Sequence, residues 1–167
     1  MFQINRTVAL LLLLPVMWVW QASPLALLPV FGWRLDPALV IAIAGGLLNG
    51  PRFGLWFGLI AGGGQDLLLG AGLLYGATKA LAGLTAGVIQ PQFYRMDALT
   101  LGLVGLVWTL GEGLLVALYL LAQGRTAVWD HYAALSLPLG VAHALLLVVL
   151  YAWLFRLPGE DREERVK

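Results

Sequence analysis

Apolar residues dominate this chain in long runs that are interrupted at short intervals by proline, glycine and charged residues. Such runs are typical of helices that cross a bilayer, since one crossing needs about 20 mostly apolar residues. The interruptions delimit predicted helices at residues 7–31, 37–48, 53–69, 73–89, 98–122 and 131–155. The pattern therefore predicts an all-α integral membrane protein, a compact bundle of six transmembrane helices that forms one domain over residues 1–156.

Local signals mark the helix ends. Asp36 and Pro37 form a helix start, with Asp36 as the N-cap and Pro37 in the first turn. Residues 49–52 (Asn-Gly-Pro-Arg) and 70–72 (Gly-Ala-Gly) are turn signals. The predicted helix 37–48 is short for a full crossing, so an alternative with five crossings and a re-entrant second helix stays open.

The first apolar run resembles a signal peptide, but the bulky Trp20 makes a poor cleavage site. We therefore interpret residues 7–31 as an uncleaved membrane helix. Pro15, Pro24 and Pro29 predict kinks or a break within it.

Basic residues are distributed unequally between the two sides of the predicted bundle. Seven of them share the side of the termini, namely Arg6, Arg52, Arg95, Arg156, Arg162, Arg165 and Lys167, whereas Arg34 and Arg125 lie opposite. Loops rich in Lys and Arg stay in the cytoplasm. We therefore expect both termini, including a charged tail at residues 157–167, to be cytoplasmic.

Composition supports this interpretation. The chain is 60% hydrophobic and 11% charged, with a mean hydropathy of +0.86, whereas soluble domains have about 25% charged residues. The net charge of +1 gives no reason to expect a nucleic-acid partner. The absence of cysteine excludes disulfides, thiol catalysis and thiolate metal sites.

A row of glycines organises the centre of the sequence. Gly50, Gly54, Gly58 and Gly62 are spaced four apart, so on a helix they form one groove without side chains. In a membrane such a groove lets a second helix pack closely. Whether that helix is internal or belongs to a partner protein is open at this point.

Polar side chains inside the predicted helices are the candidate functional residues: Gln65, Asp66, Lys79, Glu112 and His143. Asp66 and Lys79 fall at similar heights around the 70–72 turn, which allows an ion pair, although Lys79 could instead extend independently to the headgroups. Glu112 and His143 could meet near the midplane, although His143 could equally be a neutral core histidine.

No pattern for catalysis emerges. Ser23 and Ser136 are the only serines, and neither has a nucleophile motif or an evident base beside it. No zinc-binding or phosphate-binding motif is present. We therefore expect a protein that is not an enzyme and that has no cofactor and no metal site.

The segment FGLIAGGGQDLLLGAGLLYGATKALAGLTAG, residues 57–87, resembles the signature region of the MreD family of bacterial rod shape-determining proteins. The matching residues are Gly58, Gly62, Gln65, Asp66, Leu67, Leu68, Gly70, Leu81, Gly83 and Gly87. The resemblance extends the helix-packing or partner groove to Gly83 and Gly87. Glu112 has no place in the family pattern.

The resemblance implies a non-enzymatic scaffold in the bacterial cytoplasmic (inner) membrane. Such a scaffold docks MreC and connects the MreB cytoskeleton to lateral peptidoglycan synthesis by RodA and a class B penicillin-binding protein, and so controls cell shape. The remaining partner is the lipid bilayer.

The alternative is the substrate-binding membrane subunit of an energy-coupling-factor vitamin transporter. That class has a similar length and six helices, and small residues spaced four apart, as in Ala22 and Ala26, line its coupling surface. A transporter needs polar and aromatic side chains that converge on a pocket.

Overall fold

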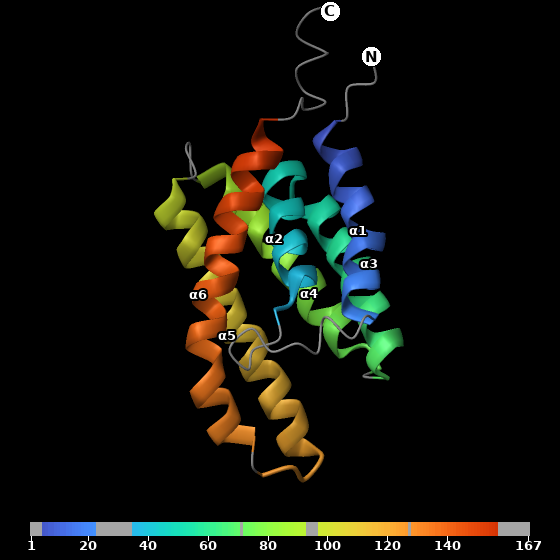
Figure 1. Ribbon diagram of the computed structural model, residues 1–167, viewed down its shortest axis with the longest axis vertical. Coiled ribbons are helices and arrows are strands. Elements are labelled where there is room, and N and C mark those ends of the chain that lie inside the picture. Colours follow the sequence, from blue (N-terminus) through green and yellow to red (C-terminus); the bar gives the residue numbers. More distant parts are fainter. Residues whose placement is uncertain (1–4, 23–34, 71, 93–96, 127, 157–167) are drawn as a thin grey trace, which may run out of the picture.

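The structure is a computed structural model that describes residues 5–22, 35–70, 72–92, 97–126 and 128–156. All regular structure within these residues is helical (Figure 1). The elements are α1 (Arg6–Ala22), α2 (Pro37–Asn49), α3 (Pro51–Leu69), α4 (Leu74–Ile89), the short 3₁₀ helix η2 (Gln90–Gln92), α5 (Ala98–Ala122) and α6 (Val128–Phe155).

The six α-helices run up and down along the long axis of a bundle (Figure 1). The start of α1 and the end of α6 lie at the same end, as a six-helix arrangement predicts, and the turn between α5 and α6 lies at the opposite end. α2 begins part-way along the bundle instead of at its end. Its 13 residues span only about 20 Å, whereas the hydrocarbon core of a bilayer is about 30 Å thick.

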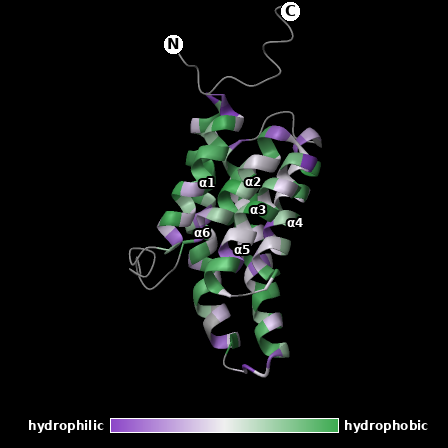
Figure 2. Ribbon diagram, turned by 90° about the vertical axis from the view of Figure 1, so that its right-hand side faces the viewer, coloured by the Kyte–Doolittle hydropathy of each residue, from purple (hydrophilic) through white to green (hydrophobic). Residues whose placement is uncertain are grey.

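α2 forms the centre of the packed core. Eleven of its 13 residues are buried, and its sequence is apolar on every side, as expected for a helix that is surrounded by others. Hydrophobic residues make up most of the helices (Figure 2), and many large ones are exposed on the outside of the bundle. α5 and α6, with 25 and 28 residues, are long and apolar enough to cross a membrane.

The predicted helix ends agree closely with the structure from the second helix onward. α5 has the predicted bounds, and its N-cap Asp97 accepts a 2.7 Å hydrogen bond from the Thr100 backbone N–H. Hydrogen bonds from the side chain and then the backbone of Thr100 hold the pKa of Asp97 below its ordinary value. α6 begins three residues earlier than predicted, at Val128. The later part of the first predicted helix, with Pro24 and Pro29, and the tail at residues 157–167 lie outside the described residues.

The glycine groove of α3 is filled by α4 of the same chain. A Cβ atom on Gly54 would overlap the Gly83 carbonyl, and one on Gly58 would overlap the carbonyl of Lys79. At Gly62 the overlap would be with the Tyr75 carbonyl. The two backbones therefore touch along three successive turns, which only glycine permits.

The groove also has defined limits. Gly50, with φ of 86°, lies in the turn between α2 and α3, and a Cβ there would meet nothing within 4 Å. Gly87 of α4 instead packs against the backbone of Pro51 at the start of α3. Gly46 of α2 packs on the backbone of Gly83, so α2, α3 and α4 form one closely packed unit.

The groove generates a matched pair of tests on one helix. Gly58→Ala should destabilise the protein by about 1–3 kcal/mol, because the new methyl group overlaps backbone that has no room to move. Gly63→Ala should be neutral or stabilising, because its Cβ would enter open space. Thermal unfolding in detergent measures both, and equal melting temperatures would contradict this packing.

Candidate functional site

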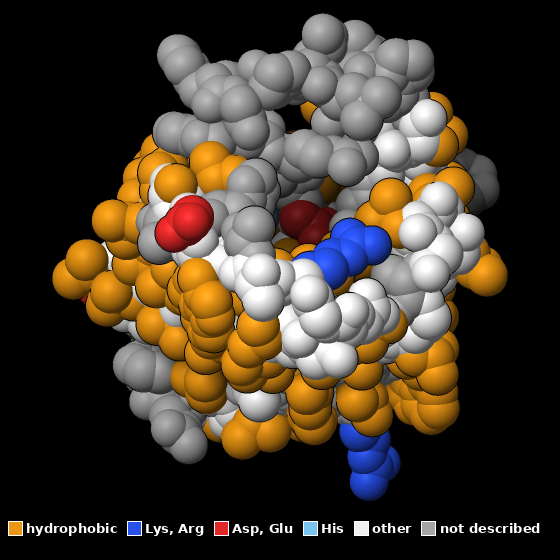
Figure 3. All heavy atoms as spheres, turned by 90° about the horizontal axis from the view of Figure 1, so that it is seen from below, with side chains coloured by type: hydrophobic (Ala, Val, Ile, Leu, Met, Phe, Trp, Pro, Cys, Tyr) orange, Lys and Arg blue, Asp and Glu red, His pale blue; other side chains and the backbone are white. Residues whose placement is uncertain are grey.

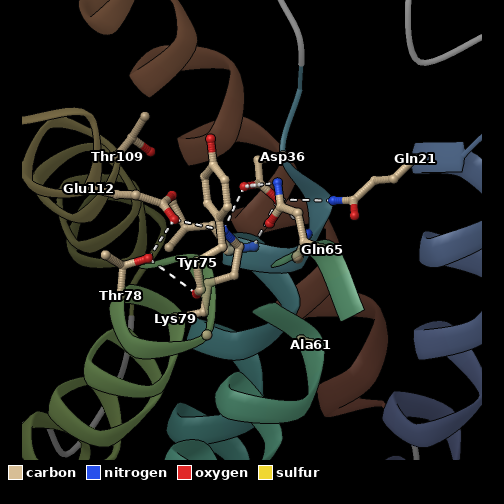
Figure 4. A network of polar contacts seen from close by, with 12 residues as sticks. Gln21, Asp36, Ala61, Gln65, Tyr75, Thr78, Lys79, Thr109 and Glu112 are labelled. Atoms are coloured by element: carbon tan, nitrogen blue, oxygen red, sulfur yellow. Dashed lines mark hydrogen bonds and ion pairs between the residues drawn. The ribbon is translucent and has the colours of Figure 1, made fainter. Parts of the chain in front are cut away.

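The Lys79 side chain is completely buried, with 0% of its surface exposed. Its Nζ atom lies 2.8 Å from Asp36 Oδ2 and 2.6 Å from Glu112 Oε1, so one ammonium group joins two carboxylates (Figure 4). The Thr78 hydroxyl donates a further 3.0 Å bond to Glu112. These contacts connect α2, α4 and α5 in the interior, where a buried charge is retained only if it is paired.

Asp36 is the centre of this network because it is also the N-cap of α2. Its Oδ1 atom accepts from the backbone N–H groups of Ala38 and Leu39, at 3.0 and 3.4 Å. The amide groups of Gln21 in α1 and Gln65 in α3 also donate to its carboxylate, at 3.3 and 3.2 Å. One carboxylate therefore caps a helix and binds side chains from three others, including α4.

His143 of α6 connects α5 and α6 to Asp36. Its Nε2 atom accepts a 2.8 Å hydrogen bond from the Asp36 backbone N–H. Its Nδ1 atom lies 3.0 Å from the Thr109 hydroxyl, which itself donates to the Gly105 carbonyl at 2.7 Å. Because Nε2 is an acceptor and the hydroxyl proton is already used, the imidazole is neutral with its proton on Nδ1.

Asp66 has a different role from the one predicted. Its carboxylate accepts hydrogen bonds from the backbone N–H groups of Tyr75 and Gly76, at 3.0 and 2.7 Å. It therefore satisfies the free donors at the start of α4 and fixes the turn between α3 and α4. The predicted ion pair of Asp66 with Lys79 is absent, because Lys79 turns instead toward α2 and α5.

The predicted direct contact between Glu112 and His143 is also not formed. Glu112 bonds to Lys79 and Thr78, and His143 bonds to Asp36 and Thr109. Both side chains nevertheless belong to the same network, because Lys79 and Asp36 connect Glu112 to His143.

A pocket of about 430 Å³ lies over this network. Its lining comes from the ends of α1 and α3, the starts of α2, α4 and α6, and the second half of α5. Polar lining residues are Gln21, Asp36, Gln65, Tyr75, Thr109, Glu112, Tyr132, Ser136 and His143. The view along the bundle axis in Figure 3 shows a hollow with acidic side chains at its floor. Small-molecule sites in proteins have this size and this mixture of apolar wall and few polar groups.

Four residues of the polar network were not selected from the sequence: Asp36, Gln21, Thr78 and Thr109. Asp36 was identified as a helix cap and was assigned to a loop near the membrane surface. The short length of α2 could have predicted an interior position for Asp36. A helix that is too short to cross the membrane must begin or end inside the bundle. Gln21 carried no such signal.

Metal binding has no evident basis in this site. Among the residues that the structure describes, no cluster of three or more His, Cys, Asp or Glu side chains could hold a metal ion. Ser136 and His143 both line the pocket, but both ring nitrogens of the neutral His143 are engaged by Asp36 and Thr109.

The fold and the site define a multi-pass helical membrane domain with a polar pocket in its interior. Residues 10–155 match the family of five-transmembrane domains described as 5TMR of 5TMR-LYT, and the chain belongs to this family. Comparison with curated proteins and with solved structures finds no match.

This family membership corrects the assignment to the MreD family, which was wrong. The shared motif was short, apolar and glycine-rich, and tight packing of two membrane helices produces such a motif in unrelated proteins. The scaffold function is overturned with it, and so are the cell-shape and MreC-binding roles. MreC, MreB, RodA and the penicillin-binding protein were inferred from that resemblance alone. The alternative of a vitamin-transporter subunit has no support either.

Substitution of Lys79 tests whether the two carboxylates depend on it. Lys79→Met leaves both buried without a counterion, and removing one partner of a buried ion pair costs about 3–5 kcal/mol. Glu112→Gln should cost less stability than Lys79→Met, because Lys79 keeps its ion pair with Asp36. Adding Glu112→Gln to Lys79→Met should restore part of the stability, since one of the two facing charges is removed. Strictly additive losses in detergent unfolding experiments would contradict the shared network.

Proposed function

We propose that this chain is the ligand-binding membrane domain of a receptor, in which the pocket over the Lys79 network recognises a small molecule. The observation that carries the proposal is the position of the pocket. It lies where all six α-helices contribute residues, directly over a buried ionic network that connects them. Because the lining residues come from all six helices, a ligand bound in the pocket would change the packing of the whole bundle. The domain acts by binding and not by catalysis.

The family supports this assignment. The five-transmembrane domain that the chain matches is typically associated with the sensor histidine kinase LytS. A sensor of this kind needs a membrane part that changes its helix packing when a ligand binds.

The sidedness of the pocket follows from the basic residues. Arg6, Arg52 and Arg156 lie at or beside the starts of α1 and α3 and the end of α6, at one end of the bundle. Arg125 lies in the turn between α5 and α6, at the other end, toward which the pocket opens. By the positive-inside rule the first end is cytoplasmic, so the pocket faces the outside of the bacterial cytoplasmic membrane.

A reporter fused after Lys167 tests this orientation. A reporter that is active only in the cytoplasm should be active there, and a second reporter inserted after Gly124 should be active only outside. The opposite pattern would place the pocket on the cytoplasmic side and would contradict recognition of an external ligand.

Blocking the pocket tests binding itself. Val116 of α5 lines the pocket, so Val116→Trp should fill it, while Val107→Trp adds the same side chain at a position that is 63% exposed. The purified protein is heated in the presence of a diverse set of small metabolites. A ligand at one hundred times its Kd adds about 2.7 kcal/mol of stability.

We expect at least one compound to raise the melting temperature of the wild type and of Val107→Trp, and to leave Val116→Trp unchanged. The proposal fails if no compound produces such a shift, or if Val116→Trp responds as the wild type does.

A further inference from the structure

We propose that the ligand of this pocket is a small organic cation, a primary amine with an apolar body. The inference rests on the proposed ligand-binding function and specifies the class of ligand. Two independent features of the pocket support it. One is the sum of the charges, and the other is a pair of buried amide oxygens that accept no hydrogen bond from the described residues.

With Asp36 and Glu112 both counted as carboxylates, the charges of the site sum to one negative charge. Asp36 and Glu112 line the pocket, and Lys79 beneath them balances only one of the two. His143 adds no charge, because its Nε2 atom accepts a hydrogen bond from the Asp36 backbone N–H. No Lys or Arg is among the described residues of the lining. A ligand with one positive charge would neutralise the site, and charge complementarity of this kind sets specificity.

Two buried amide oxygens supply the second observation. Gln21 and Gln65 both line the pocket, and each directs its amide N–H toward Asp36. Their Oε1 atoms are buried and accept no hydrogen bond from any residue that the structure describes. Only 9% of Gln65 is exposed, so water does not readily replace a missing donor there. A buried acceptor without a donor is unfavourable, and a ligand that brings N–H groups would satisfy it.

A primary ammonium group fits these features. It carries one positive charge and three N–H donors and has no acceptor, whereas the free groups of the site are carboxylate and amide oxygens. Apolar side chains form the rest of the wall, among them Leu68, Leu69, Leu135 and Leu139. They would pack on the hydrocarbon part of the ligand. A carboxylate ligand would add negative charge beside Asp36 and Glu112 and would satisfy neither amide oxygen.

A matched set of probes tests the class of ligand. Each of two carbon skeletons is supplied as amine, alcohol and acid: 2-phenylethylamine, 2-phenylethanol and phenylacetate, and butylamine, butan-1-ol and butyrate. Affinities are measured by thermal shift on the purified full chain in detergent, at a pH where the amines are charged. The acids carry the charge opposite to that of the amines, so they are the direct competitors. We expect the amines to bind at least tenfold more tightly than the matched alcohols and acids.

Two variants connect this preference to the residues. Glu112→Gln leaves Asp36 and Lys79 as a neutral pair, so the preference for amine over alcohol should fall about tenfold. Gln65→Met removes the buried acceptor at similar length and should weaken the amine selectively. Thr85→Val is the control, because the Thr85 hydroxyl bonds only to carbonyls of its own helix.

The outcomes separate the two proposals. If acids or alcohols bind more tightly than amines and Val116→Trp abolishes that binding, the amine is wrong and the proposed function stands. If no compound of any class gives a shift that Val116→Trp removes, both are wrong. An amine preference that persists unchanged in both Glu112→Gln and Gln65→Met would also overturn the inference.

Discussion

The ammonium group of Lys79 is buried where the helices of this bundle meet, and its need for counterions determines how they are arranged. A lone charge in such a place would cost several kcal/mol, about as much as the whole stability of many domains. Two carboxylates from different helices satisfy it, Asp36 at the start of α2 and Glu112 in the middle of α5. Through Asp36 the same network reaches Gln21 in α1, Gln65 in α3 and His143 in α6. Each of the six described α-helices thus contributes a polar group to one connected set.

The glycine groove makes this arrangement possible. Because Gly58 has no side chain, the backbone of α4 at Lys79 lies directly against α3. Asp66 fixes where α4 begins by accepting from the first free N–H groups, and this sets the height of Lys79 along the bundle. Backbone packing and helix capping therefore place the ammonium group within reach of Asp36 and Glu112. Lys79 also lies 4.7 Å from the centre of the Tyr75 ring, a further favourable contact for a buried cation.

Much of this fold could be predicted from the sequence, and much of the site could not. Apolar runs and turn residues located α2 to α5 to within about two residues at each end, which is the usual precision of helix boundaries. The row at Gly54, Gly58 and Gly62 was identified correctly as a surface for close helix packing, and the structure shows that the packing helix is α4. These features depend on local sequence, in which spacing and residue type carry the information.

The partners of the charged residues depend on tertiary structure instead. Heights counted from a turn relate only helices that are joined by that turn, so they suggested Asp66 for Lys79 and His143 for Glu112. The true partner, Asp36, is more than 40 residues from Lys79 and lies on a helix that begins inside the bundle. The capping role of Asp36 was predicted correctly. Its second role, as a counterion of Lys79, was missed because the helix cap already explained the carboxylate.

Under the proposed receptor function, the location of the pocket gives the network a consequence for signalling. α2, α3 and α4 pack chiefly on one another through glycine and small residues, and α5 and α6 pack chiefly on each other. The pocket lies at the junction of these two groups, where the Asp36 backbone N–H donates a hydrogen bond to His143. Packed helices shift as rigid units between discrete arrangements. A ligand that engages Asp36 or Glu112 would therefore alter contacts between the two groups while leaving the glycine-packed unit intact. α6, which runs back from the pocket to the end where α1 begins, would carry that change to the other side of the membrane.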